Sequence, residues 1–87
     1  MSCKKDHSSI QGIMDALPND QGGNGRHKCA ACAYEQGFID GKNLKEQIDL
    51  EDLFSRLEDS QAKAQRHKSP HAAYAKGYLD GVIASYN

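Results

Sequence analysis

The feature that most limits how this chain can fold is an internal repeat with a spacing of forty residues. Residues 26–41 read RHKCAACAYEQGFIDG and residues 66–81 read RHKSPHAAYAKGYLDG, so eight of the sixteen aligned positions are identical. Typical residue frequencies give about one identity by chance over that length. The match extends upstream without gaps to two apolar sets that share the spacing i, i+3, i+4, i+7: Ile10, Ile13, Met14 and Leu17, and Leu50, Leu53, Phe54 and Leu57. The sequence therefore contains two copies of one structural unit.

Apolar residues at this spacing lie on one stripe of an α-helix. They predict the first helix of each unit, over residues 9–17 and residues 49–62. Ser9 and Asp49 stand just ahead of the two stripes, and both residue types are favourable N-caps.

The second helix of each unit is predicted to begin after the RHK triplet. Ser69 and Pro70 form the clearest boundary in the chain, with serine as the N-cap and proline at the first helical position. Cys29 holds the same place in the first unit. We expect these helices to extend to about Gly41 and Tyr86.

The predicted fold is all-α: two tandem helical hairpins, related by a pseudo-two-fold axis, that together form a four-helix domain. A chain of 87 residues is long enough for one small domain. We assign residues 1–8 to a disordered tail and residues 9–87 to the domain. Within the domain, residues 9–41 form unit one, residues 42–48 the connector, and residues 49–87 unit two.

Small residues recur at every fourth position of the second helices: Ala33, Gly37 and Gly41, and Ala73, Gly77, Gly81 and Ser85. Each interior glycine costs a helix about 1 kcal/mol relative to alanine, so this face is predicted to be approached closely. We expect the two second helices to cross along it, in an antiparallel arrangement. That arrangement predicts ion pairs of Asp80 with Arg26 or His27, and of Asp40 with Arg66 or His67.

The net charge of −1 provides no overall positive field for nucleic-acid binding. No apolar run approaches the roughly 20 residues of a membrane span, and the first residues lack the apolar core of a secretory signal. We therefore expect a cytoplasmic protein with no membrane association. In a reducing compartment, the C-x-x-C of Cys29 and Cys32 is more typical of a metal ligand pair or a redox pair than of a structural disulfide.

Metal binding is the first hypothesis for these thiols. Cys29 and Cys32 have a familiar zinc spacing, and His67 and His71 lie one helical turn apart in the corresponding region of unit two. Together they form a candidate four-ligand zinc set, although 34 residues separate the two pairs. The alternative is that both cysteines are small helix-terminal residues that bind no metal.

Redox chemistry is a second reading of the same thiols, because a helix N-terminus stabilises a thiolate. Unit two has Ser69 and Ala72 at the matching positions, so thiol chemistry is not the shared purpose of the repeat.

The duplicated basic triplet is a candidate anion site, because positive side chains just before a helix start suit a phosphate group and a nearby tyrosine can stack on a base. The residues of this predicted anion or partner site are Arg26, His27, Lys28, Tyr34, Arg66, His67, Lys68 and Tyr74. The alternative is that these side chains form internal ion pairs and packing contacts.

No hydrolase or phosphate-loop motif is present, so we predict that the chain is not an enzyme. The leading hypothesis is a small non-catalytic binding module, which recognises a phosphate-bearing ligand or a protein partner, or associates with itself. The alternative is a small zinc-stabilised domain that uses Cys29 and Cys32 with histidines of unit two.

Overall fold

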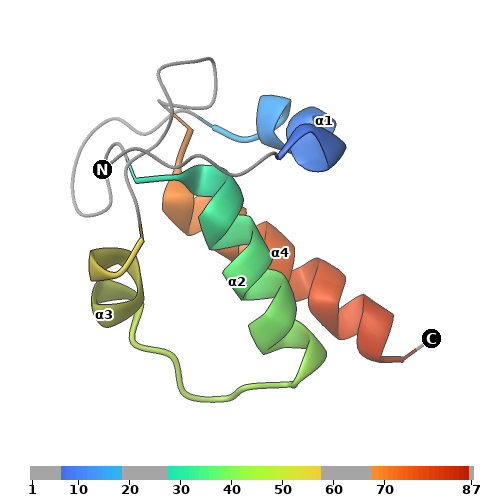
Figure 1. Ribbon diagram of the computed structural model, residues 1–87. Coiled ribbons are helices and arrows are strands. Elements are labelled where there is room, and N and C mark those ends of the chain that lie inside the picture. The colour runs from blue at the N-terminus through green and yellow to red at the C-terminus, as the bar shows by residue number, and fades with distance from the viewer. Residues whose placement is uncertain (1–6, 19–27, 58–67, 87) are drawn as a thin grey trace.

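The computed structural model describes residues 7–18, 28–57 and 68–86. These ranges fold into the short 3-10 helix η1 (Ser8–Ile10) and four α-helices: α1 (Gln11–Asp15), α2 (Ala30–Lys42), α3 (Leu50–Ser55) and α4 (Pro70–Ser85) (Figure 1). The predicted all-α class is confirmed. Within the described ranges, no helix is both long enough and apolar enough to cross a membrane.

Three of the four predicted N-caps are confirmed. The side chains of Cys29, Asp49 and Ser69 each accept a hydrogen bond from the backbone N–H three residues later, at 3.3, 3.1 and 3.1 Å. Ser9 is not a cap. It lies inside η1, and Ile10, which precedes α1, makes no side-chain capping bond. Local capping chemistry thus sets the start of α2, α3 and α4.

Three predicted boundaries shift in the structure. The helix expected over residues 9–17 consists of η1 followed by α1 and ends at Asp15. The helix expected over residues 49–62 ends at Ser55, where the hydroxyl bonds back to the carbonyl of Asp52 and competes with the helical pattern. Residues 58–62 lie outside the described ranges. The predicted tail over residues 1–8 is too long at its end, because His7 is buried and Ser8 begins η1. Residues 1–6 lie outside the described ranges.

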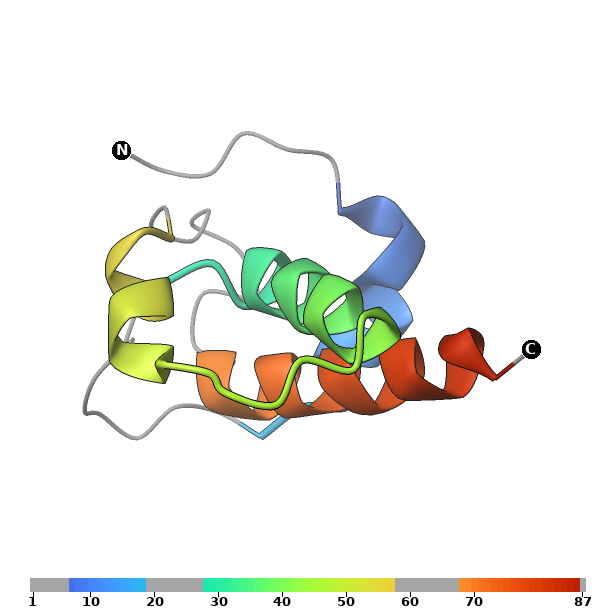
Figure 2. The same cartoon turned by 90° about the horizontal axis from the view of Figure 1, so that it is seen from below.

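Helices α2 and α4 pack side by side and form the centre of the molecule (Figures 1 and 2). A Cβ atom added at Gly41 would lie 2.8 Å from the carbonyl carbon of Tyr78, and one added at Gly81 would lie 3.0 Å from that of Phe38. Gly37 and Gly77 face the opposite backbone in the same way, one turn earlier. The glycine-lined faces therefore allow backbone-to-backbone contact, as the sequence predicted.

The two central helices run parallel, so the predicted antiparallel arrangement is wrong. Gly77 lies against Tyr34 and Phe38, whereas Gly81 lies against Phe38 and Lys42, so positions advance together along both helices. A two-fold axis that runs along a helix pair relates parallel helices, whereas an axis that runs across the pair relates antiparallel helices. A sequence repeat is compatible with both arrangements. Here residues 43–57, which include α3, carry the chain back along the pair, so that α2 and α4 begin at the same end (Figure 1).

Helices α1 and α3 lie on opposite sides of the central pair (Figures 1 and 2). Each buries its apolar stripe against the pair, with Met14 of α1 at 0% exposure and Phe54 of α3 at 3%. Lys28 and Lys68 hold the ends of these short helices, because their amines donate to the carbonyl oxygens of Leu57 and Leu17 at 3.1 and 3.0 Å. The resulting core is small and surrounds the N-terminal half of α2.

Candidate metal centre

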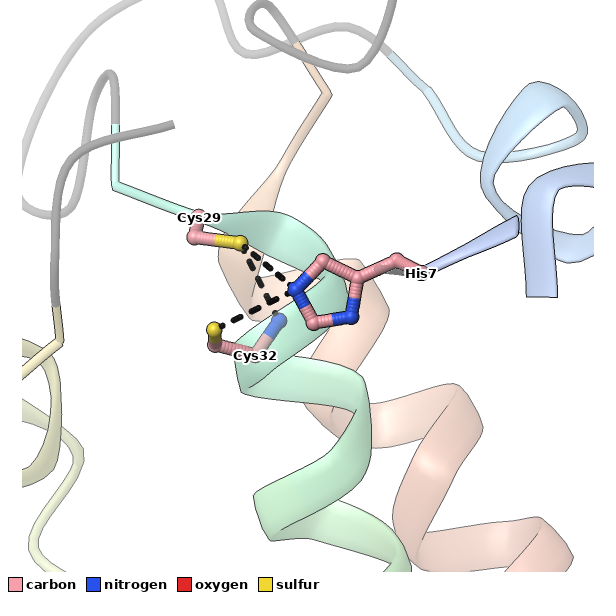
Figure 3. A group of neighbouring side chains, drawn as sticks. All are labelled: His7, Cys29 and Cys32. Carbon is pink, nitrogen blue, oxygen red and sulfur yellow. Dashed lines mark hydrogen bonds between the residues drawn. The ribbon is translucent and has the colours of Figure 1, made fainter. Parts of the chain in front are cut away.

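Three potential metal ligands meet where the N-terminal segment crosses the start of α2. His7 immediately precedes η1, Cys29 is the N-cap of α2, and Cys32 lies in its first turn. Figure 3 shows the imidazole of His7 reaching toward both sulfur atoms. Its Nε2 atom lies 3.7 Å from Sγ of Cys29 and 3.6 Å from Sγ of Cys32, and one donor atom from each of the three lies within 4.8 Å of the others.

These distances fit a tetrahedral zinc site. Bond lengths of about 2.3 Å for sulfur and about 2.05 Å for nitrogen give a sulfur–nitrogen edge of about 3.6 Å in a regular tetrahedron. Both observed separations, 3.7 and 3.6 Å, are close to that edge. The two nitrogen–sulfur separations thus match those of a zinc site, and the two sulfur atoms lie within 4.8 Å of each other.

Glu35 is the hydrogen-bond partner of the second ring nitrogen of His7. Its Oε2 atom lies 3.1 Å from Nδ1 of His7, and its side chain is 45% exposed. With Nε2 as the ligand atom, Nδ1–H donates to this carboxylate, which fixes the tautomer and the ring orientation. A carboxylate partner of this kind also raises the basicity of a metal-binding imidazole.

The position of the cysteines at a helix start favours thiolate chemistry. The backbone N–H of Cys32 donates to Sγ of Cys29 at 3.3 Å, so one sulfur is both a helix cap and a candidate ligand. Partial positive charge at a helix N-terminus stabilises negative groups, and α2 and α4 begin at the same end of the molecule (Figure 1). All three side chains are buried, at 5% exposure for His7, 0% for Cys29 and 9% for Cys32.

The structure brings together only part of the predicted zinc set. Cys29 and Cys32 belong to the cluster, whereas the exposed His71 packs its ring edge-on against Phe54, with 4.6 Å between the ring centroids. His67 lies outside the described ranges. Sequence reasoning missed His7 because it falls in a polar segment without helical periodicity. The sequence pattern that could have pointed to His7 is its spacing from Cys3, which stands four residues earlier in the chain.

The described members of the predicted anion site make internal contacts. Beyond its bond to Leu17, the amine of Lys68 lies 3.3 Å from the carbonyl oxygen of Asp15, and that of Lys28 bonds Leu57 as noted above. Arg26, His27, Arg66 and His67 lie outside the described ranges, and with them the predicted ion pairs to Asp40 and Asp80.

The tyrosines of that site instead bond the two repeated aspartates. The hydroxyl of Tyr34 donates to Asp80 at 2.7 Å and that of Tyr74 donates to Asp40. Burial, aided by the bond and charge of Asp80, raises the pKa of Tyr34 to about 12, and burial beside Asp40 raises the pKa of Tyr74 further. Burial acts to raise the pKa of Asp80, but the bonds from Tyr34 and Lys76 and the lysine charge outweigh it and hold that pKa below its usual value.

Comparison with known proteins adds no relationship: the chain matches no protein-family model, no curated protein and no solved structure.

Proposed function

We propose that this chain is a non-catalytic helical module stabilised by one zinc ion, which fastens the N-terminal segment to the start of α2. The observation that carries the proposal is the spacing of Nε2 of His7 from the sulfurs of Cys29 and Cys32, 3.7 and 3.6 Å. Thiolate and imidazole are the donors that zinc prefers in structural sites. The Glu35 carboxylate on the far ring nitrogen supports the same assignment.

A bound ion would stabilise the packing of η1 and α1 on the rest of the molecule. Helices η1 and α1 contain three and five residues, which is too short for a helix to be stable alone. Their contacts with the rest of the molecule include buried Met14, the apolar residues beside it, the Lys68 bonds and His7. Small domains with limited cores often gain stability from a structural metal. The ion would therefore supply folding free energy rather than chemistry on a substrate.

The proposed module consists of two copies of one helical hairpin, related by a two-fold axis that runs along the α2–α4 pair. Reciprocal contacts between positions forty residues apart support this proposal. Lys28 bonds Leu57 while Lys68 bonds Leu17, and Tyr34 bonds Asp80 while Tyr74 bonds Asp40. The metal site departs from this symmetry, because unit two has serine and alanine in place of the cysteines.

The internal contacts of Lys28, Lys68, Tyr34 and Tyr74 support assigning these four residues to the fold rather than to a phosphate-bearing ligand. Partner binding or self-association stays a prediction. The side chains best placed to carry it are the large apolar ones that are more than half exposed: Ile39, Leu79, Ile83 and Tyr86.

The proposal is tested by metal analysis of protein purified without a histidine tag. We expect about one equivalent of zinc per chain for the wild type and for His71→Ala, the matched control from the predicted set that lies outside the cluster. The variants His7→Ala and Cys32→Ser should lose most of the metal. Wild-type protein with less than about a tenth of an equivalent after zinc reconstitution would refute the proposal. Loss of zinc in His71→Ala together with retention in His7→Ala would refute this ligand set.

A further inference from the structure

We infer that Cys29 and Cys32 form a redox switch, in which a peroxide oxidises the pair to a disulfide, the zinc ion is released and the N-terminal segment is detached. This inference rests on the proposed function and adds its regulation. The two cysteines stand three residues apart at the start of α2. Their sulfur atoms lie within 4.8 Å of each other, and Nε2 of His7 lies 3.7 and 3.6 Å from them. One reaction between the two sulfurs therefore removes two of the three clustered ligands.

The internal repeat shows that helix capping alone does not require a cysteine at position 29. Ser69 holds the equivalent position in unit two, and its hydroxyl accepts a hydrogen bond from the N–H of Ala72 at 3.1 Å. Sγ of Cys29 accepts the corresponding bond from the N–H of Cys32 at 3.3 Å. The second helix of unit two thus begins in the same way without a thiol, and serine is one of the preferred N-caps. The thiols of unit one therefore serve a purpose other than starting a helix.

The backbone at the start of α2 permits a disulfide between these two residues. Residues three apart in an α-helix have Cα atoms about 5 Å apart, given a radius of about 2.3 Å and a rise of about 1.5 Å per residue. Disulfides join residues whose Cα atoms are about 4.4–6.8 Å apart. Side-chain rotation can therefore bring the sulfurs from their present separation, within 4.8 Å, to bonding distance. No helix has to move.

The oxidation balances with hydrogen peroxide as the oxidant. Zinc binding keeps both sulfurs as thiolates. Cys32 is 9% exposed and Cys29 is 0% exposed, so the peroxide meets Cys32 first. The Cys32 thiolate attacks one peroxide oxygen, the O–O bond breaks, and hydroxide leaves behind a sulfenic acid. The Cys29 thiolate then attacks that sulfur, the S–S bond forms, and the S–O bond breaks to release a second hydroxide. Both hydroxides take protons from the solvent, two electrons pass from the sulfurs to the peroxide, and zinc leaves as the divalent ion.

Loss of the ion acts on the segment that the ion would hold. The thiolate is the form of cysteine that binds a metal, so the disulfide leaves His7 as the remaining ligand of the described cluster. His7 directly precedes η1, and η1 and α1 contain three and five residues. Helices this short depend on tertiary contacts. Oxidation therefore weakens the packing of η1 and α1, and a dithiol reductant reverses the change because it regenerates both thiolates.

Peroxide treatment of the zinc-loaded full chain tests the switch. We expect release of about one equivalent of zinc, read with a chromogenic chelator, together with the loss of two hydrogen atoms in the intact mass. Peptide mapping should place the disulfide between Cys29 and Cys32, and a dithiol reductant should restore zinc binding. Zinc retention with both thiols intact, or a disulfide from either residue to Cys3, would overturn the inference and leave the proposed function intact. A wild type that binds no zinc before treatment would refute the proposed function itself.

The variant Cys29→Ser tests the order of the two steps. Because serine caps the equivalent helix at Ser69, this variant should keep the helix content of the wild type. Metal-free Cys29→Ser should gain oxygen at Cys32 on peroxide treatment, since the second thiol of the pair is missing. His71→Ala, the matched control outside the cluster, should release zinc as the wild type does. If peroxide left Cys32 unmodified in Cys29→Ser, the proposed reaction would be refuted.

Amide hydrogen exchange tests the consequence for the fold. In the oxidised protein, amides of η1 and α1 should exchange at least about 10-fold faster than in the reduced, zinc-loaded protein. Unchanged protection of these amides after complete disulfide formation would overturn the switch, although the zinc content measured before oxidation would still support the metal site.

Discussion

Two glycine-to-alanine substitutions are expected to change stability in opposite directions. Gly41 lies on the face of α2 that meets α4, where an added Cβ would be 2.8 and 2.9 Å from the carbonyl carbon and the Cα of Tyr78. Gly12 lies in α1, where an added Cβ would find nothing within 4 Å. We expect Gly41→Ala to destabilise the protein and Gly12→Ala to stabilise it.

The magnitudes follow from the contacts. In both helices, alanine gains up to about 1 kcal/mol over glycine in helix propensity. At Gly41, the neighbouring atoms are backbone atoms of Tyr78 and cannot rotate away, so the methyl group requires α2 and α4 to separate. Overpacking of this kind typically costs about 1–3 kcal/mol, and backbone contact places it at the upper end. The expected net loss is about 2 kcal/mol, which lowers Tm by roughly 8–16 °C, against a gain of about 0.5–1 kcal/mol for Gly12→Ala.

Urea unfolding followed by circular dichroism measures both free energies, with the zinc concentration held constant because a bound metal shifts apparent stability. The midpoint should fall for Gly41→Ala and rise for Gly12→Ala at an unchanged m-value. If Gly41→Ala proved as stable as the wild type, the close parallel contact between α2 and α4 would be refuted.

Three further expectations concern polar contacts. Tyr74→Phe should cost about 2–3 kcal/mol in urea unfolding and Tyr34→Phe about 1–2 kcal/mol. The difference is expected because Asp40 is 4% exposed and keeps the neutral amide of Gln36 as a donor, whereas Asp80 keeps a charged lysine partner. Stability should be full below pH 10 and fall as the pH rises toward 12, since the raised tyrosine pKa values mean that the unfolded chain loses these protons first. Glu35→Gln should weaken zinc binding about 10–100-fold in a chelator competition, with little change in helix content.

Each of these has an outcome that contradicts it. Equal losses of unfolding free energy in Tyr74→Phe and Tyr34→Phe would mean that the different surroundings of Asp40 and Asp80 do not change the contribution of the two hydrogen bonds. A stability profile that stays flat from pH 10 to pH 12 would argue against the buried tyrosine–aspartate bonds. Zinc affinity in Glu35→Gln equal to that of the wild type would remove the carboxylate from the site.

The sequence predicted the features that depend on local chemistry. Capping by Cys29, Asp49 and Ser69 involves atoms three residues apart, so it can be read without knowing the fold. The close contact of Gly41 and Gly81 with the opposite helix was likewise foreseeable, because interior glycines need a packing reason.

The predictions that were wrong concern contacts between segments that are far apart in the sequence, and these contacts depend on the path of the chain between them. Parallel and antiparallel crossings use the same small-residue face, so the direction of α4 is set by the path of the connecting chain. The place of His7 is set by a contact with residues 22 and 25 positions away, and no periodicity marks it. His71 looked like a ligand by spacing, yet its ring packs against that of Phe54, a contact between residues 17 positions apart that spacing alone does not reveal.

The central claim, that a metal ion holds the N-terminal segment on the helix pair, is tested most directly by thermal unfolding in the presence of a chelator. The account predicts that removing zinc lowers Tm by tens of degrees or abolishes the cooperative transition, and that added zinc restores it. An identical, fully cooperative transition with and without chelator, in protein shown to contain zinc beforehand, would contradict it.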